Sequence, residues 1–151
     1  MEKYGYKFSF GPWNIHEGAD PFGPPVRPTV AFEKKLEAYQ RLGFDAVQFH
    51  DDDAVPDLDH KSAQQIEQEA RALKQRLADR GLVAEFVAPR LWEHPITVDG
   101  AYTSNNPAAR LYARERSHKM LDIAQAVGTD FVVLWLAREG TYLREAKDAV
   151  R

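Results

Sequence analysis

The sequence predicts an α/β fold with a parallel sheet, because one unit recurs three times along its 151 residues. In each unit an amphipathic helix ends at a glycine, and a short apolar strand follows directly. Such alternation is typical of parallel strands joined by right-handed helical crossovers. The three helix-to-strand junctions are Leu42-Gly43-Phe44, Arg80-Gly81-Leu82 and Val127-Gly128-Thr129.

The first three elements follow from local apolar patterns. Phe32, Leu36 and Tyr39 recur at spacings of four and three, which gives the first helix one buried face. The elements are a strand at 7–10, a helix from about 29 to 42 and a strand at 46–49.

Capping residues mark the later helices. The second helix begins at Ser62, where Gln65 completes a capping box. The third takes Asn106 as its N-cap and Pro107 in its first turn, and Arg116 interrupts its apolar stripe. The remaining elements are strands at 83–88 and 130–135 and the start of a fourth helix at 142–150.

Two architectures fit this order of elements, an open doubly wound sheet and an eight-stranded TIM (β/α)8 barrel. Long loops at 14–28 and 89–105 follow the first and third strands, on the side where barrel enzymes build their sites. No glycine-rich phosphate fingerprint follows a strand, so we favour the barrel. A barrel usually needs about 250 residues. Residues 1–151 would therefore be the N-terminal half of a catalytic domain, roughly its first four βα units, ending inside helix 4. We expect such a piece to fold only with its missing half, or as a dimer that imitates it.

Composition excludes several classes of function. The formal charge of −3 gives no basic field for nucleic acid or anionic lipid. No apolar run approaches the roughly 18 residues that a membrane span needs. The absence of cysteine excludes disulfides, thiolate catalysis and cysteine metal sites, and fits a cytoplasmic location.

The segment Phe49-His50-Asp51-Asp52-Asp53 carries the strongest functional signal. A histidine and three carboxylates are costly to bury unless they pair or bind something. Catalytic groups cluster at strand ends of this kind in parallel α/β proteins. The alternative is structural: His50 caps a loop, and the aspartates form a solvated turn or a helix cap, which we expect for Asp51 and Asp52.

Five ordered segments resemble the shorter, actinobacterial-type class of xylose (glucose) isomerase. That family is a TIM barrel, more than twice this length, that interconverts aldoses and ketoses with two divalent cations, usually Mg²⁺, Mn²⁺ or Co²⁺. Its metal ligands and catalytic lysine lie in the half absent from this chain, so the resemblance places no metal ligand here. The segments are Trp13, Asp20-Pro21-Phe22-Gly23, Phe49-His50-Asp51-Asp52-Asp53, Tyr102-Thr103-Ser104-Asn105, and Val133-Leu134-Trp135 with Arg138-Glu139-Gly140.

The resemblance implies roles for particular residues. His50 would help to open the cyclic sugar, and Asp53 would orient the imidazole and stabilise its protonated form. Trp13 and Trp135 would wall the sugar pocket, the alternative being ordinary core packing. Phe22 would reach into the neighbouring subunit of a homotetramer, the alternative being an exposed loop.

The third loop departs from the family pattern. Trp92 stands where the family has phenylalanine, Arg90 where it usually has asparagine, and Ala88 where a threonine contacts the sugar. Arg90 is suited to a carboxylate or phosphate of a substrate. It is equally able to pair with Glu93 or with an aspartate, and we favour this second role.

The leading prediction is a metal-dependent isomerase of xylose and xylulose, and of glucose and fructose. A related barrel, such as a sugar epimerase or an apurinic endonuclease, is the first alternative, and the negative charge argues against the endonuclease. The second alternative is a non-catalytic half-barrel that needs another chain for activity.

Overall fold

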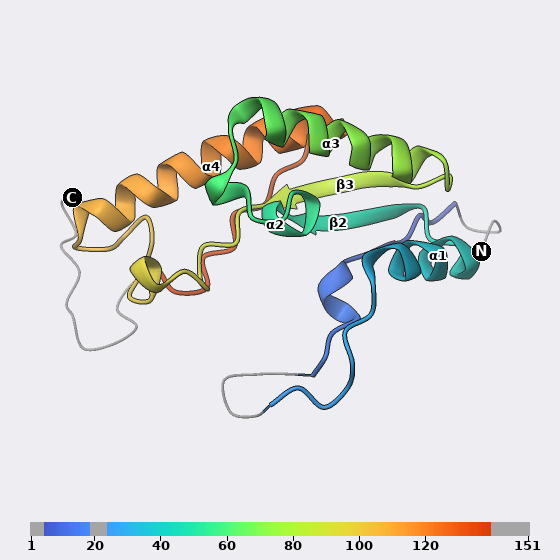
Figure 1. Cartoon of the computed structure of the whole chain (residues 1–151), viewed down its shortest axis with the longest axis horizontal. Helices are drawn as coiled ribbons and strands as arrows, with labels where there is room; N and C mark the ends of the chain where they lie inside the picture. The colour runs from blue at the N-terminus through green and yellow to red at the C-terminus, as the bar shows by residue number, and fades with distance from the viewer. Residues whose placement is uncertain (1–4, 19–23, 140–151) are drawn as a thin grey trace.

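The computed structural model describes residues 5–18 and 24–139, and these form a parallel sheet flanked by helices (Figure 1). The strands are β1 (Ser9–Phe10), β2 (Ala46–His50) and β3 (Val83–Ala88), in the spatial order β1-β2-β3. Both neighbouring pairs are parallel. Strand order in space thus follows order in sequence, as in a barrel, whereas a doubly wound sheet reverses direction at a switch point.

The helices connect successive strands. Helix α1 (Phe32–Leu42) lies between β1 and β2, and α3 (Ala63–Ala78) lies between β2 and β3. Helix α4 (Pro107–Val127) follows β3 and packs along α3, as Figure 1 shows. The short elements are the one-turn helix α2 (Asp51–Ala54) and the 3₁₀ turns η2 (Pro12–Asn14), η3 (Leu58–His60) and η4 (Pro95–Thr97).

Local capping explains where α3 and α4 begin. The Gln65 side-chain oxygen accepts from the Ser62 N–H at 2.9 Å, and the Ser62 hydroxyl accepts from the Gln65 N–H at 3.3 Å. Asn106 Oδ1 accepts from the Ala108 N–H at 3.0 Å. Both predicted caps are confirmed. Gly128, which ends α4, has a φ of 85°, a left-handed conformation that glycine adopts without strain.

Helix α1 begins later than predicted. Its N-cap is Ala31, whose carbonyl accepts from the Lys34 N–H at 3.0 Å, so the helix starts at Phe32 rather than near residue 29. The Thr29 side chain instead hydrogen-bonds the Glu17 carboxylate. Thr29 therefore belongs to the preceding loop.

The predicted strand at 130–135 is not a regular strand. One parallel bridge joins Val132 to Val87, and the Val133 N–H donates to the Val87 carbonyl at 3.1 Å. Phe131 and Trp135 are 70% and 63% exposed. The segment runs beside β3, but its side chains lack the packing on both faces that would hold a buried strand. The predicted helix at 142–150 lies outside the described residues.

The core lies between the sheet and the helices. Val47 and Phe49 of β2 pack with Leu36 of α1, Leu73 of α3 and Ile123 of α4. The other face of the sheet carries a polar group, in which Gln48 Nε2 donates to Ser9 Oγ and to Glu85 Oε2, each at 2.9 Å. This face is the interior side of a barrel wall.

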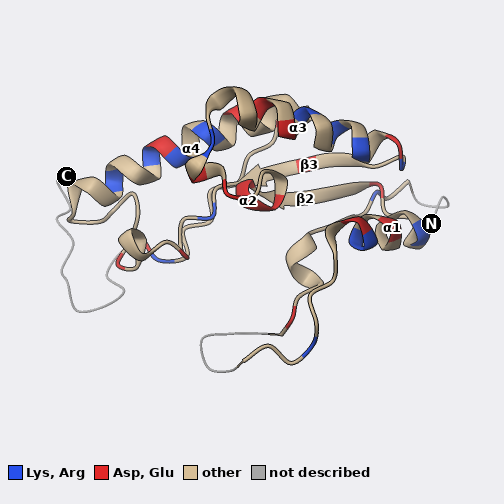
Figure 2. Ribbon diagram, viewed as in Figure 1, with Lys and Arg blue, Asp and Glu red and all other residues tan. Residues whose placement is uncertain are grey.

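Charged residues are distributed differently among the helices. Figure 2 shows acidic residues gathered on α2, while α3 and α4 carry residues of both signs along their length. No helix in the described part of the chain is long and apolar enough to cross a lipid bilayer.

Candidate functional site

The site lies where β2 passes into α2. Residues alternate along β2, so Val47 and Phe49 face the core while His50 faces the opposite side. His50 is the N-cap of α2, and the three aspartates that follow fill its first turn.

His50 and Asp53 form the predicted pair. Asp53 Oδ2 lies 3.1 Å from His50 Nδ1 and accepts from the His50 backbone N–H at 3.2 Å. The aspartate therefore caps the short helix and orients the imidazole at once. The structural and functional interpretations of this sequence are compatible.

The electrostatics of Asp53 fix the roles of the two histidine nitrogens. Burial tends to raise the pKa of Asp53, but the hydrogen bond from His50 and the charge of Arg90 outweigh it and lower the pKa. Asp53 is thus a carboxylate at neutral pH and can only accept hydrogen bonds. The proton of a neutral His50 ring accordingly sits on Nδ1, which leaves Nε2 as the basic atom.

A pocket of about 420 Å³ opens beside this pair. The Trp13 and Trp92 rings lie 4.4 Å and 5.1 Å from the His50 ring, centroid to centroid. The chain has three tryptophans, and all of them line this pocket. The 63% exposure of Trp135 is not that of a core residue. The lining is Trp13, His50, Phe86, Ala88, Trp92, Val133 and Trp135.

Charge is absent from this lining. No Lys, Arg, Asp or Glu among the described residues borders the pocket. The predicted site residue Phe22 lies outside the described residues, so its position relative to the pocket stays a prediction.

Arg90 pairs with carboxylates, which decides between its two predicted roles. Its Nε donates to Asp52 Oδ1 at 2.8 Å, its Nη2 to Asp53 Oδ2 at 3.1 Å and its Nη1 to Glu93 Oε1 at 3.1 Å. The guanidinium therefore has protein partners on all of its nitrogens and is not directed at a substrate anion.

Asp51 was predicted to be solvated or to cap a helix, and the solvated alternative is wrong because Asp51 is completely buried. Arg116 of α4, only 7% exposed, donates to it from Nε and, at 3.0 Å, from Nη2. Asp51 Oδ1 also accepts from the backbone N–H of Arg90 at 3.0 Å. Burial raises the pKa of Asp51, against the hydrogen bonds and charge of Arg116. This bridge ties α4 to the α2 turn and to the end of β3.

One feature of the sequence indicates the ion pair between Arg116 and Asp51. Arg116 interrupts the apolar stripe of α4, and a buried cation requires an anion nearby. Its position did not reveal which of the three consecutive aspartates would be the partner.

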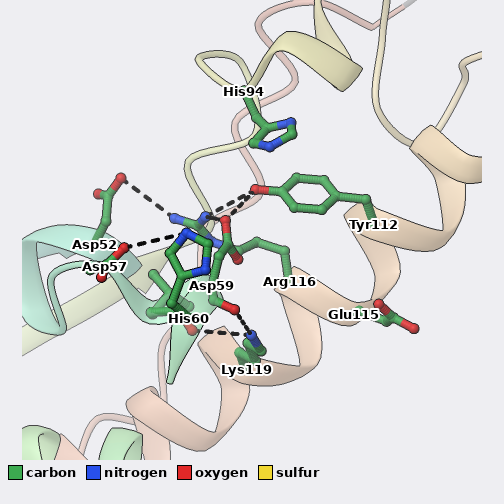
Figure 3. A pocket seen from close by; sticks show the side chains of 10 residues that line it. Asp52, Asp57, Asp59, His60, His94, Tyr112, Glu115, Arg116 and Lys119 are labelled. Atoms are coloured by element: carbon green, nitrogen blue, oxygen red, sulfur yellow. Dashed lines mark hydrogen bonds and ion pairs between the residues drawn. The ribbon is translucent and has the colours of Figure 1, made fainter. Parts of the chain in front are cut away.

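A second, polar pocket of about 380 Å³ is lined by Arg116 together with residues of η3 and α4 (Figure 3). Arg116 Nη1 donates to Asp59 Oδ2 at 2.8 Å, and the Tyr112 hydroxyl donates to the same oxygen at 2.8 Å. Burial raises the pKa of Tyr112 to about 12. The His94 ring stacks on Tyr112 with centroids 4.5 Å apart. Arg116, Tyr112 and Asp59 of this pocket bind one another and join η3 to α4, and the stacking of His94 on Tyr112 joins the loop after β3 to the same helix.

Glu139 joins two loops near the first pocket. Its carboxylate accepts from the backbone N–H groups of Ala101, Tyr102 and Thr103 at 3.0, 2.9 and 2.8 Å. Burial opposes ionisation of Glu139, but these bonds and the Thr103 hydroxyl lower its pKa. The chain that leaves Trp135 is thereby fixed to the loop that precedes α4.

No metal centre is formed by the residues that the structure describes. Within 5–18 and 24–139, no group of three or more His, Cys, Asp or Glu side chains could hold a metal ion. The two cations implied by the resemblance thus do not fit the donors of this part of the chain.

Known proteins share the fold of this chain. A family model described as xylose isomerase-like TIM barrel matches residues 36–151. The chain is similar in fold to D-psicose 3-epimerase with D-tagatose from Clostridium cellulolyticum H10, with a TM-score of 0.56 and 16% identity. It is also similar to the probable 3-DHS dehydratase AsbF, involved in petrobactin synthesis, from Bacillus anthracis, with a TM-score of 0.50 and 14% identity.

These alignments cover most of this chain but only part of the other proteins. They include 87% and 86% of this chain, and 37% and 38% of the epimerase and dehydratase chains. At such low identities the likeness is one of fold. The strand order and the matched family together give a xylose isomerase-like TIM barrel fold, of which the described strands form part of one wall.

Proposed function

The chain belongs to the xylose isomerase-like TIM barrel family, and on this basis we propose that it forms part of a metal-dependent aldose–ketose isomerase. The substrates would be D-xylose and D-xylulose, with D-glucose and D-fructose as the larger pair. One observation supports this most strongly: His50, which Asp53 orients, borders a pocket that all three tryptophans of the chain line.

The pair is suited to opening a sugar ring. His50 Nε2 would take the proton of the anomeric hydroxyl and return a proton to the ring oxygen, while the bond between the anomeric carbon and the ring oxygen breaks. The products are an aldehyde and a free hydroxyl, and the proton count does not change. The Asp53 carboxylate would stabilise the imidazolium that forms between these transfers. Positioned acid–base catalysis of this kind contributes roughly 10² to 10⁴ in rate.

The pocket favours an uncharged sugar. Flat aromatic rings pack against the apolar faces of a sugar ring and exclude water from the reacting carbons. Arg90, which shares the Asp53 carboxylate with His50, is held by Asp52, Asp53 and Glu93. A phosphate group would find no positive charge among the described lining residues.

Divalent cations, when bound, would polarise the carbonyl and hydroxyl oxygens of the open sugar. The described residues offer no donor set for them, so the contribution of this chain is sugar binding and proton transfer. Entry of Phe22 into a neighbouring pocket, and assembly as a homotetramer, remain part of the proposal.

A sugar epimerase is the second candidate. The fold likeness to D-psicose 3-epimerase is one reason, and Ala88 in the pocket lining, where the isomerases carry threonine, is another. The products separate the two reactions: an isomerase converts an aldose to a ketose, whereas a 3-epimerase converts one ketose to another.

Tryptophan emission tests the sugar pocket directly, since all three tryptophans report on it. D-xylose and D-glucose should change the emission of the chain with millimolar affinity, about 4 kcal/mol of binding free energy. D-glucose 6-phosphate should bind more weakly. The same titration on Trp135→Phe should give a smaller signal, with Arg71→Met, on the exposed face of α3, as the unaffected control. An emission spectrum that no sugar alters would contradict the proposal.

A further inference from the structure

One oxygen of the Asp53 carboxylate accepts hydrogen bonds from two donors, the His50 ring and the Arg90 guanidinium. Oδ2 lies 3.1 Å from His50 Nδ1 and 3.1 Å from Arg90 Nη2. An anion that is shared with a permanent cation stabilises an imidazolium less than an unshared anion does, and the cation itself repels the imidazolium.

Arg90 is held in this position from several sides. Asp52 and Glu93 bind its other nitrogens, and its side chain is only 14% exposed. Its backbone N–H donates to the buried Asp51, and its guanidinium carbon lies 5.8 Å from the centre of the Trp92 ring. The guanidinium is therefore a fixed charge in a partly desolvated setting, where electrostatic effects are stronger than in water.

We propose that Arg90 is a positioning residue that divides the Asp53 carboxylate between itself and His50, and so weakens the hold of the His50 ring on a proton. A weaker hold makes proton release to the ring oxygen of a sugar easier. That catalytic consequence rests on the proposed function, whereas the effect on protonation depends only on the contacts described.

The other described groups around His50 add no free charge that would act on its ring as Arg90 does. Trp13 and Trp92, the rings packed on it, carry no charge. Asp51 is bound by Arg116, and Asp52 is bound by Arg90. On the sheet below, Glu85 is held by Gln48 and Ser9. Burial, together with the charge of Asp53, raises the pKa of Tyr39 of α1 to about 12, so Tyr39 is neutral at physiological pH.

Deuterium exchange at Cε1 of each histidine, followed by mass spectrometry against pH, tests the proposal. It gives a protonation midpoint for His50, with the exposed His60 as an internal reference. In Arg90→Met the His50 midpoint should rise by about one pH unit, a tenfold gain in proton affinity. Arg71→Met removes the same charge from the exposed face of α3 and should leave the midpoint unchanged.

The Arg90→Lys variant distinguishes the effect of the positive charge from the effect of the forked guanidinium geometry. The ammonium keeps the positive charge but cannot reach three carboxylates as a fork, so the His50 midpoint should rise less than in Arg90→Met. If methionine at 90 prevents folding, the lysine variant decides alone. An unchanged or lowered His50 midpoint in the folded variant overturns the proposal. A raised midpoint with unchanged pH dependence of sugar turnover would support the Arg90 inference and count against the proposed role of His50.

Discussion

At the scale of single residues, the site depends on the charge of one carboxylate. Asp53 Oδ2 receives the His50 ring, the His50 backbone N–H and a nitrogen of Arg90, all within 3.2 Å. These three donors compensate for its partial burial. Neither the helix turn nor the orientation of the imidazole would be fixed without them.

Replacement of Asp53 by asparagine should destabilise the chain by about 1.5–3 kcal/mol at pH 7, the range for hydrogen bonds to charged groups. The folded-state pKa of Asp53 lies below its ordinary value of 3.8, so its stabilisation is complete above that pH and is lost as the pH falls through the folded value. Urea unfolding of both proteins between pH 7 and pH 3 measures this. The two curves should converge in acid; a gap that widens toward pH 3 would refute the assignment.

The residues of the site were predicted unequally well. His50 and Asp53 lie three positions apart at a strand end, and this spacing brings them together in the first turn of a helix. The burial of Asp51 was not predicted, because successive helical residues point in directions about 100° apart and the sequence does not show which one turns inward. Its partner Arg116 is 65 residues away, beyond the reach of local patterns.

At the scale of elements, α4 is attached to the site by a buried ion pair. Arg116 of α4 binds Asp51 with two nitrogens and Asp59 of η3 with a third. The pair connects the outer helix layer with the turn that carries His50.

Arg116→Met should destabilise the chain by about 3–5 kcal/mol, because Asp51 is left as a buried, unpaired charge. Adding Asp51→Asn to this variant should recover part of the loss, since it removes that charge. Arg71→Met, the same substitution at an exposed ion pair, should cost less than about 1 kcal/mol. Thermal or urea unfolding provides the comparison. Equal losses at positions 116 and 71 would show that the buried bridge contributes nothing.

Elements defined by local signals were predicted best. Ser62 and Asn106 cap their own helices, so the starts of α3 and α4 could be found in the sequence. The strand predicted at 130–135 does not form as a regular strand. A strand also needs neighbours on its edges and faces, and in this segment only Val132 forms a bridge, to Val87 of β3.

At the scale of the whole molecule, large apolar side chains are exposed in the segment that runs beside β3 and on β3 itself. Phe131, Leu134 and Trp135 are 70%, 54% and 63% exposed, and Val83 of β3 is 62% exposed. Contiguous apolar surface of this kind marks an interface. The chain covers less than two fifths of the two barrels it resembles in fold, so further barrel strands would cover this region in a complete domain.

We therefore expect this chain to associate through that surface, either with the remainder of the barrel or with a second copy. Size-exclusion chromatography with light scattering should show a dimer or larger species, and Phe131→Asp should weaken it. Leu121→Asp, at an exposed apolar residue of α4, is the control and should not. A monomer that melts cooperatively without a partner would contradict this expectation.

The role proposed for His50, backed by Asp53, is to open a sugar ring in the tryptophan-lined pocket. It is tested most directly by comparing His50→Asn with the unchanged enzyme, assembled with its complete barrel, on D-xylose and on glyceraldehyde, an aldose too short to close a ring. Turnover of D-xylose should fall by roughly 10² to 10⁴, the usual contribution of positioned acid–base catalysis, and turnover of glyceraldehyde should fall far less. An equal loss on both substrates would contradict the account.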